Sequence, residues 1–324
     1  MGKIKNLGIL TSGGDAPGMN AVIRAVTRTA IQNHLKVYAI MKGYEGMIDG
    51  EIKQLLKSDV SGIIQKGGTI LKTARSKRFM TPEGRKQAYH QLQKHQIDAL
   101  VIIGGDGSFK GATVFSQEFD IPIVGIPGTI DNDMYGTDYT IGYDTCVNTV
   151  MEAVDKIRDT ASSHNRVFFV EVMGREAGFV ALQGGIACGA EAILVPEVTG
   201  QIENMMEMLA TPDRQNKSSI IFVAEGHTEG TTFEIAEKVK KRFPNLDVRV
   251  TILGHIQRGG SPTSYDRIAA SRMGVASVEA LLDDQKSIMI GLQNGEIVHV
   301  PLNKTVKLHK EVSKSLLDIA KILV

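Results

Sequence analysis

The stretch PGTIDNDMYGTD, residues 127–138, begins where the apolar run IPIVGI at 121–126 ends. That run is typical of a buried strand, and the stretch after it carries three carboxylates, Asp131, Asp133 and Asp138. Pro, Gly, Asn and Asp are ordinary turn residues, so a solvated turn would account for them. The alternative is a catalytic loop at the carboxyl end of a parallel sheet, where open α/β folds bind their ligands.

The first two carboxylates have a spacing that suits phosphoryl transfer. This reaction requires positioning, charge neutralisation and a carboxylate near the attacking hydroxyl. Asp131 and Asp133 are two residues apart, and in an extended segment their side chains point to the same face. One could act as a general base while the other faces a metal ion or polarises its neighbour. A solvated Asx turn is the structural alternative.

Two glycine-rich stretches each place a turn between a predicted strand and a predicted helix. They are LTSGGDAPGMNAVIRAV at 10–26 and VIIGGDGSFKGA at 101–112. The N–H groups at the amino end of a helix attract phosphate, and glycine lets the backbone approach it. Asp106 in the second stretch is suited to Mg²⁺, a hard cation that takes carboxylate and phosphate oxygens. The alternatives are a generic turn in the first stretch and a helix cap at Asp106.

Several basic residues lie near the ends of predicted strands. The arginines are Arg75, Arg166, Arg175, Arg249 and Arg258. A guanidinium binds phosphate through two hydrogen bonds, so five of them in a nearly neutral protein indicate a substrate with several phosphates. Any one of them alone could be a surface ion pair. His255, which precedes Arg258 in HIQR, could equally be a structural histidine.

The composition excludes several classes of protein. The chain has 324 residues, of which 42% are apolar and 23% charged, and a net charge of +1, so it is globular and has no bulk charge for nucleic acid or membranes. Cys146 and Cys188 form no C-x-x-C pair, and no His/Cys cluster has zinc spacing. Two cysteines and no signal peptide favour the cytoplasm. No apolar run is long enough to span a bilayer.

Strand-like and helix-like segments alternate along the chain. The expected strands are 7–11, 37–41, 99–104, 121–126, 167–172, 192–196, 219–224 and 248–253. The expected helices include 19–32, 83–95, 145–162, 202–209, 233–243 and 265–282. This βαβα order predicts an α/β fold with mostly parallel sheets that helices cover on both faces.

Eight motifs together resemble bacterial ATP-dependent 6-phosphofructokinase. In chain order they are TSGGDAPGMNA, IGGDGS, PGTIDND, TIGYDT, IRDTASSH, EVMGR, VAEG and LGHIQRGGSP, and they span positions 11–262. The resemblance implies a glycolytic kinase that transfers the γ-phosphoryl of MgATP to the 1-hydroxyl of fructose 6-phosphate. It also implies two similar three-layer α/β/α, Rossmann-like domains. The implied ATP-binding domain is 1–141 plus 256–306, and the substrate-binding domain is 142–255 plus 307–324.

The resemblance also assigns roles to individual residues. The implied catalytic residues are Asp131 as general base, with Asp133, Thr129, Arg75 and Arg175. The implied nucleotide site is Gly14, Arg75, Ser76, Gly105, Asp106, Gly107 and Ser108, with Asp106 binding Mg²⁺. The implied sugar-phosphate site is Thr129, Asp131, Arg166, Met173, Gly174, Arg175, Glu225, Arg249, His255 and Arg258. Arg166 and Arg249 would reach in from a neighbouring subunit of a homotetramer.

The match is weaker at the site where the family binds ADP or phosphoenolpyruvate as effectors. The matching residues are Arg24, Arg28, Arg158, Glu191, Arg214 and Lys217. The family's usual GKKH run is QNKS at 215–218, and Gly62 replaces an Asp. Because cations are missing, we expect a blunted effector response. After Arg75, the usual aromatic residue or Cys followed by Pro-Glu-Phe is replaced by SKRF at 76–79, which could alter ATP affinity or loop mobility.

Two glycines bear on the phosphoryl donor. Relatives that use pyrophosphate carry Asp at the position of Gly107 and Lys at that of Gly128. Glycine at both positions leaves space beside the transferred phosphates, which favours ATP. Three alternatives remain open: an inert nucleotide or sugar-phosphate sensor, an NAD-kinase-like enzyme, for which GGDG alone would suffice, and a dehydrogenase, which the missing G-x-G-x-x-G disfavours.

Overall fold

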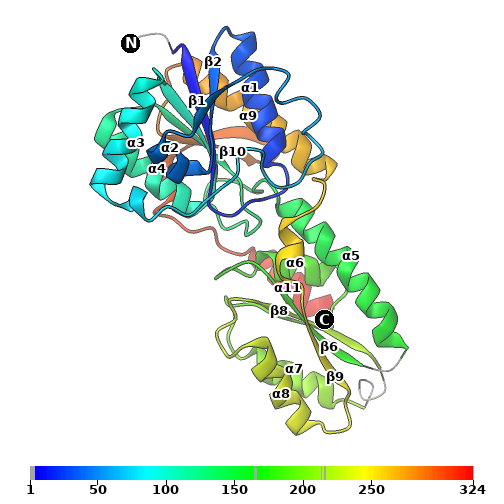
Figure 1. Cartoon of the computed structure of the whole chain (residues 1–324). Helices are drawn as coiled ribbons and strands as arrows, with labels where there is room; N and C mark the ends of the chain where they lie inside the picture. The colour runs from blue at the N-terminus through cyan, green and yellow to red at the C-terminus, as the bar shows by residue number, and fades with distance from the viewer. Residues whose placement is uncertain (1–3, 164–165, 213, 215–216, 324) are drawn as a thin grey trace. The chain divides into compact units, whose positions relative to one another are not determined.

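The chain folds into two compact α/β units, seen in a computed structural model that describes residues 4–163, 166–212, 214 and 217–323 (Figure 1). The first unit comprises Met1–Ile130, Met134–Thr145 and Arg258–Lys310. The second comprises Asp131–Asp133, Cys146–Gln257 and Glu311–Val324. Each unit therefore contains separate stretches of the sequence. The division predicted from the family resemblance, with ATP on one domain and sugar phosphate on the other, stays a prediction.

The first unit is built on a mixed sheet of seven strands in the order β11-β10-β5-β4-β1-β2-β3. The central neighbours β5, β4, β1 and β2 are parallel, whereas β3 and β11 are antiparallel edge strands. The strands are β1 Asn6–Ser12, β2 Lys36–Ile40, β3 Ile52–Leu55, β4 Ala99–Gly104, β5 Ile123–Pro127, β10 Ile288–Gln293 and β11 Glu296–Pro301. The α/β class with mostly parallel pairing is as predicted.

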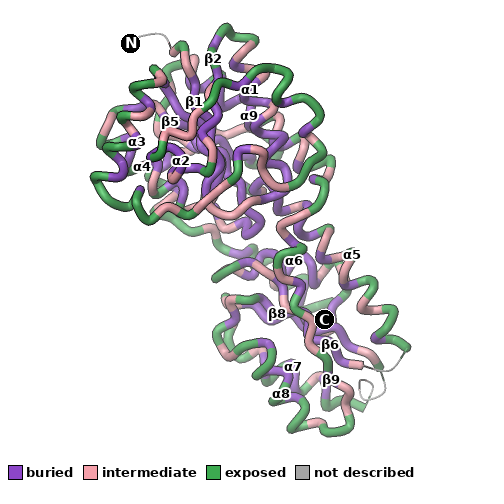
Figure 2. Tube along the Cα trace, viewed as in Figure 1, coloured by how far each residue is buried: buried purple, intermediate pink, exposed green. Residues whose placement is uncertain are grey.

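Helices cover both faces of this sheet (Figure 1). One face packs against α1 Met19–Gln32 and α9 Ser264–Leu282, and the other against α2 Gly43–Asp49, α3 Pro82–Lys94, α4 Asp106–Phe119 and α10 Leu302–Thr305. The central strands are therefore buried on both sides, and the interior of the unit is mostly buried (Figure 2). All six residues of β4 are buried. This explains why their sequences are continuous apolar runs rather than alternating ones.

The second unit is a smaller α/β sandwich. Its four strands are all parallel, in the order β7-β8-β6-β9, with bounds Ala192–Leu194, Ser219–Ala224, Val167–Val172 and Val248–Ile252. The helices α7 Gln201–Ala210 and α8 Thr232–Arg242 cover one face with a core of Ile, Val and Met side chains. The remaining helices are α5 Tyr143–Ser162, α6 Phe179–Ala187 and α11 Lys314–Leu323, and α11 packs on α6.

All eight strands and all six helices named from the sequence are present, and several further elements were missed. The missed strands are β3, β10 and β11, and the missed helices are α2, α6, α10 and α11. Helix α6, FVALQGGIA, is buried along most of its length, so it lacks the polar face that makes a helix periodic. Helix α2 has only seven residues and two glycines, which is too short for a 3.6-residue pattern to emerge.

A buried carboxylate holds the amino end of α5. The Asp266 side chain is 1% exposed and accepts hydrogen bonds from Gly142 N at 2.8 Å, Thr145 N at 2.9 Å and the Thr145 hydroxyl at 2.5 Å. Three donors compensate part of the cost of burying the group. Burial still raises the pKa of Asp266 to about 6, although the hydrogen bonds from Thr145 and Gly142 lower it.

This raised pKa gives a pH dependence with a defined sign. Between pH 4 and 6 the folded chain keeps the Asp266 proton while the unfolded chain, with its ordinary value of 3.8, loses it. The stabilisation is complete below pH 4 and is lost as the pH rises through 6. We expect the free energy of unfolding of the wild type, relative to Asp266→Asn, to fall by roughly 3 kcal/mol from pH 4 to 7 in urea titrations. Parallel pH profiles of the two proteins would contradict this.

Candidate active site

Three loops of the first unit lie side by side at the carboxyl edge of its sheet. Ser12, at the end of β1, is in register with Gly104 at the end of β4, and Gly104 is in register with Pro127 at the end of β5. The strands are parallel neighbours, so the loops at 13–16 and 105–107 and the segment after Pro127 leave the sheet at one level. The three motifs that the sequence singled out are therefore adjacent, as expected for a ligand-binding edge.

Glycine is required where these loops approach one another. A Cβ added at Gly104 would lie 2.5 Å from the Ser108 hydroxyl oxygen and 2.6 Å from Ser12 O, which the backbone could not accommodate. Gly105 lies against the Thr129 side chain, 3.5 Å from an added Cβ. At Gly107 an added Cβ would meet nothing within 4 Å. Of these glycines, Gly107 alone faces open space, and it lies in the first turn of α4.

The sequence argument about Gly128 needs correction. An added Cβ there would lie 2.9 Å from the Ile103 methyl Cγ2 and 3.1 Å from Met19 Cε. Gly128 is therefore explained by close packing against apolar side chains rather than by space left beside phosphates. The steric argument for the phosphoryl donor holds at Gly107 only.

Asp106 is the first residue of α4 and carries the only carboxylate of its glycine-rich turn. Its side chain is 32% exposed and forms an ion pair with Lys110 Nζ, one helical turn later, at 2.7 Å. The sequence analysis did not identify Lys110, although the i, i+4 spacing could have shown the pair. No cluster of three or more metal-binding side chains exists among the residues that the structure describes. One carboxylate still fits Mg²⁺, which is commonly held by one or two carboxylates together with substrate phosphates and waters.

Arg258 comes from a distant part of the chain and packs against the first loop, at 13–16. Its Nη1 donates a hydrogen bond to Asp15 O at 3.2 Å, and a Cβ added at Gly14 would lie 2.5 Å from the same nitrogen. The guanidinium thus lies against the turn at which the sequence predicts phosphate binding. Its predicted contact with the sugar phosphate stays a prediction. His255, in the same motif, is exposed.

The first half of the stretch PGTIDNDMYGTD, residues 127–132, is buried rather than a solvated turn, whereas Asp133 is half-buried and Asp138 is exposed. Thr129 is 7% exposed, Asp131 1% and Asn132 4%. The Thr140 hydroxyl donates to Thr129 O at 2.6 Å, and Asn132 adopts a left-handed conformation with φ 54°. The chain passes from the first unit to the second after Ile130, so Thr129 and Asp131 belong to different units although only Ile130 separates them.

In the second unit, Asp131 faces Arg175 at the carboxyl end of β6. Arg175 Nε lies 3.3 Å from Asp131 Oδ2. Arg175 has the left-handed φ of 54°, and Glu225 at the end of β8 fixes this turn by accepting from Arg175 N at 2.7 Å and Gly174 N at 3.2 Å. The sequence predicted Glu225 as a sugar-phosphate residue, and here it orients the MGR turn.

Gln257 contacts the candidate site and was not among the residues predicted from the sequence. It is fully buried, and its Oε1 accepts from Met173 N at 3.1 Å. Its position inside the quoted HIQR motif was the available signal. Through this contact it supports the same turn as Glu225, with Met173 only partly exposed.

Arg166 and Arg249 lie at the opposite end of the same sheet. Arg166 directly precedes β6 and Arg249 is the second residue of β9, so both stand at the amino edge. They share Asp247, with Arg166 Nε 2.7 Å from Oδ2 and Arg249 Nε 3.0 Å from Oδ1. Arg166, then Arg249, holds the pKa of Asp247 below its usual value. A strand of six residues separates them from Arg175 by about 20 Å, so one chain does not bring these arginines together.

The predicted effector residues fall into two groups. In the second unit, Glu191 Oε1 lies 3.4 Å from Arg214 Nη1 and 3.7 Å from Arg158 Nη1. Lys217 is exposed, and Asn216, one of the departures from the family pattern, lies outside the described residues. Arg24 and Arg28 are half-buried on α1 in the first unit. Gly62 has φ 63° with open space around it.

Comparison with known proteins shows which family the chain belongs to. A family model described as phosphofructokinase matches residues 6–281. The chain belongs to the phosphofructokinase family. This confirms the resemblance inferred from the motifs, and no observation supports the dehydrogenase or NAD-kinase-like alternatives.

Phosphofructokinases from several organisms resemble the chain over nearly its whole length. ATP-dependent 6-phosphofructokinase 2 of Bacteroides thetaiotaomicron is 59% identical over 99% of both chains. ATP-dependent 6-phosphofructokinase 1 of Thermus thermophilus is 53% identical, again over 99% of both. Among solved structures, the phosphofructokinase of Saccharomyces cerevisiae has a TM-score of 0.89 and 38% identity, covering 98% of this chain and 46% of that one. Among the described residues, no helix is both long and apolar enough to cross a membrane.

Proposed function

We propose that this phosphofructokinase transfers the γ-phosphoryl group of ATP to the 1-hydroxyl of fructose 6-phosphate, giving fructose 1,6-bisphosphate and ADP. The observation that carries the proposal is the alignment of three motif loops at one sheet edge, joined through Thr129 and Ile130 to the buried Asp131. The names of the curated relatives support ATP as the donor. Phosphoryl transfer depends chiefly on positioned charge, and the described residues supply it.

Each step of this proposed reaction is assigned to particular residues of the chain. Asp131, buried and close to Arg175, would take the proton of the attacking hydroxyl as general base. Arg75 would neutralise charge on the moving group, and the N–H groups at Gly14 and the start of α4 would bind the phosphates. Thr129 and Asp133 would orient the reacting groups, and the turn at Met173, Gly174 and Arg175 would hold the sugar phosphate with His255 and Arg258.

Asp106 would hold Mg²⁺ together with phosphate oxygens of the nucleotide. When bound, the ion neutralises charge on those oxygens. Lys110 pairs with Asp106 Oδ2, so binding of the ion through this oxygen would displace Lys110. The exposed lysine can move away at little cost because its head group is solvated.

A homotetramer is proposed from the placement of Arg166 and Arg249. Both carry a guanidinium, which can bind phosphate, at the edge of the sheet opposite to Arg175. If they contact the sugar phosphate, they must do so on another copy of the chain. We also propose a reducing compartment such as the cytoplasm, because Cys146 and Cys188 carry thiols rather than a shared disulfide.

One assay tests the activity. Purified protein is supplied with ATP, Mg²⁺ and fructose 6-phosphate, and fructose 1,6-bisphosphate is measured by coupling to aldolase. We expect turnover with ATP and negligible turnover when pyrophosphate replaces it. A protein that binds both ligands without turnover would instead be an inert sensor, and turnover with pyrophosphate would overturn the donor assignment.

The proposed effector site leads to a prediction about regulation. Glu191 pairs with Arg158 and Arg214 in this structure, and Ser218 carries no charge where the family usually has a histidine. Because an anionic effector finds fewer cations, we expect phosphoenolpyruvate to inhibit weakly, with half-inhibition only at high concentration. Removing the negative charge by Glu191→Gln leaves Arg158 and Arg214 without their ion-pair partner and should strengthen inhibition. Tight, saturable inhibition of the wild type would contradict the prediction.

A further inference from the structure

The loop that carries Arg75 is fixed on both sides of that residue. Before it, the Thr73 hydroxyl donates to Gly13 O at 2.7 Å and Lys72 O accepts from the Thr11 hydroxyl at 2.9 Å, which ties the loop to the end of β1. After it, the Ser76 hydroxyl donates to Glu45 on α2. Arg75 is exposed and lies only two residues from one anchor and one residue from the other.

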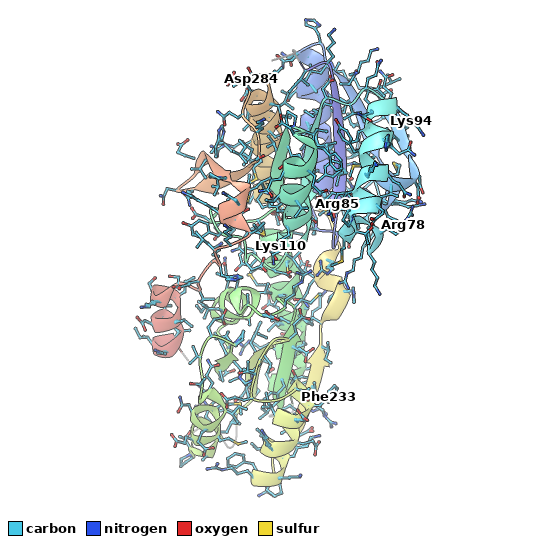
Figure 3. The ribbon with its side chains drawn as sticks, turned by 90° about the vertical axis from the view of Figure 1, so that its left-hand side faces the viewer. Arg78, Arg85, Lys94, Lys110, Phe233 and Asp284 are labelled. Carbon is cyan, nitrogen blue, oxygen red and sulfur yellow. The ribbon has the colours of Figure 1, made fainter. Side chains whose placement is uncertain are left out.

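Glu45 is the centre of the second anchor. Besides the bond from Ser76, its Oε1 accepts from Arg78 Nη1 at 2.7 Å, and the same nitrogen lies 2.8 Å from Asp49 Oδ1 (Figure 3, where Arg78 is labelled). The Glu45 side chain is 27% exposed, less than either of its charged neighbours. The hydrogen bond from Ser76 and then that from Arg78 lower the pKa of Glu45, so the carboxylate is charged at neutral pH.

An apolar contact continues this anchor to the nucleotide loop. The Phe79 ring stacks on Tyr44 with centroids 3.9 Å apart, and Phe79 N donates to the Ser76 hydroxyl at 3.1 Å. The Tyr44 hydroxyl, whose pKa burial raises, donates to Ser108 O in the first turn of α4 at 2.5 Å. The Arg75 loop and the GGDGS turn are therefore both fastened to adjacent residues of α2.

These contacts involve two residues that depart from the usual family pattern, Ser76 and Arg78, together with Phe79, which keeps the pattern's phenylalanine. Ser76 and Arg78 form the polar contacts with α2, and Phe79 forms the apolar one. A proline that would stiffen the segment is absent, and side-chain bonds to Glu45 restrain it instead. Contacts with α2 therefore restrain this segment in the absence of the proline.

We propose that Glu45 is a positioning residue that acts through Arg75, holding this guanidinium at the place of phosphoryl transfer. The expected effect of Glu45 on kcat rests on the proposed function. The expected effect of Glu45 on the structure of the Arg75 loop rests on the described contacts alone. Misplacement of a catalytic group by about 1 Å can cost 10²-fold in rate, so loss of the anchor should be visible in kcat.

A double-mutant cycle tests whether Glu45 acts through Arg75. In the wild-type background we expect Glu45→Ala to lower kcat by about 10- to 100-fold, with the KM for fructose 6-phosphate unchanged. In the Arg75→Ala background the same change should lower kcat less than about 2-fold, because the group being positioned is gone. Glu45→Gln, which keeps an acceptor for Ser76 but loses the charge that faces Arg78, should recover part of kcat. Fully additive losses would overturn the inference.

Hydrogen exchange tests the structural part without any turnover. Glu45→Ala should speed amide exchange over 72–80 and leave the β4 and β5 amides protected. The control is Glu51→Gln. Glu51 directly precedes β3, pairs with Lys42 and is 38% exposed. Loss of its charge should leave both the amide exchange over 72–80 and kcat unchanged. Unchanged exchange over 72–80 in Glu45→Ala would overturn the inference. If the wild type lacked activity while exchange still rose, the proposed function would fail and the anchor would stand.

Discussion

Asp131→Ala is expected to lower kcat by about 10²–10⁴-fold, the usual contribution of a general base, and to leave the affinity for ATP nearly intact. The residue is 1% exposed and faces Arg175, whereas the predicted nucleotide loops belong to the first unit. Steady-state kinetics and nucleotide binding by calorimetry measure the two effects separately. Asp131→Asn keeps the size of the side chain and should lose a similar factor, because an amide cannot accept the proton.

The same loop offers a control for this experiment. Asp138 also follows β5, but its Oδ2 accepts from Asn294 N at 2.7 Å and it is far along the loop from the proposed base. Asp138→Asn should retain kcat within about 2-fold, because an amide oxygen can still accept that bond. A folded Asp131→Ala protein with unchanged kcat would remove Asp131 from the mechanism.

Gly107→Asp is expected to lower kcat/KM for ATP by about 10²-fold, because placing like charges together costs several kcal/mol. The structure leaves open space at this position and its backbone is not left-handed, so the substitution introduces charge without a steric clash. The carboxylate would stand in the first turn of α4, next to Asp106 and the proposed phosphate site.

Gly107→Asn separates charge from size. It has nearly the same volume as the aspartate, so a purely electrostatic effect leaves it close to the wild type. We expect the loss with Gly107→Asp to exceed that with Gly107→Asn by at least about 10-fold when initial rates are compared at low ATP. Equal losses would show that the space is needed for the nucleotide itself.

The sequence predicted where the loops of the candidate site leave the sheet, because glycine turns after apolar runs mark strand ends. Parallel strands place their carboxyl ends at one edge, so adjacency of the loops at Gly14, Asp106 and Thr129 followed from the fold class. The registers that align these ends do not follow, since they depend on packing between distant strands. Pairings such as Asp106 with Lys110, or Ser76 with Glu45, depend on side-chain conformations that motifs do not encode.

One missed element did have a readable signal. Strands β10 and β11 are joined by Asn294–Gly295, both with positive φ, 51° and 81°. Asn-Gly between two apolar runs is a strong hairpin signal, so this pair of strands could have been predicted from the sequence alone. The edge strand β3 had no such signal, since its IKQL sequence alternates only briefly.

The shared level at which Ser12, Gly104 and Pro127 end their strands constrains how this gene can change. Exchanges among Val, Ile and Leu inside β1, β4 or β5 preserve the alignment, because strand length is untouched. A codon gained or lost within any of them would move its loop by about 3.3 Å and turn its side chains to the opposite face. Selection should therefore remove insertions and deletions in these strands and tolerate them in distant surface loops.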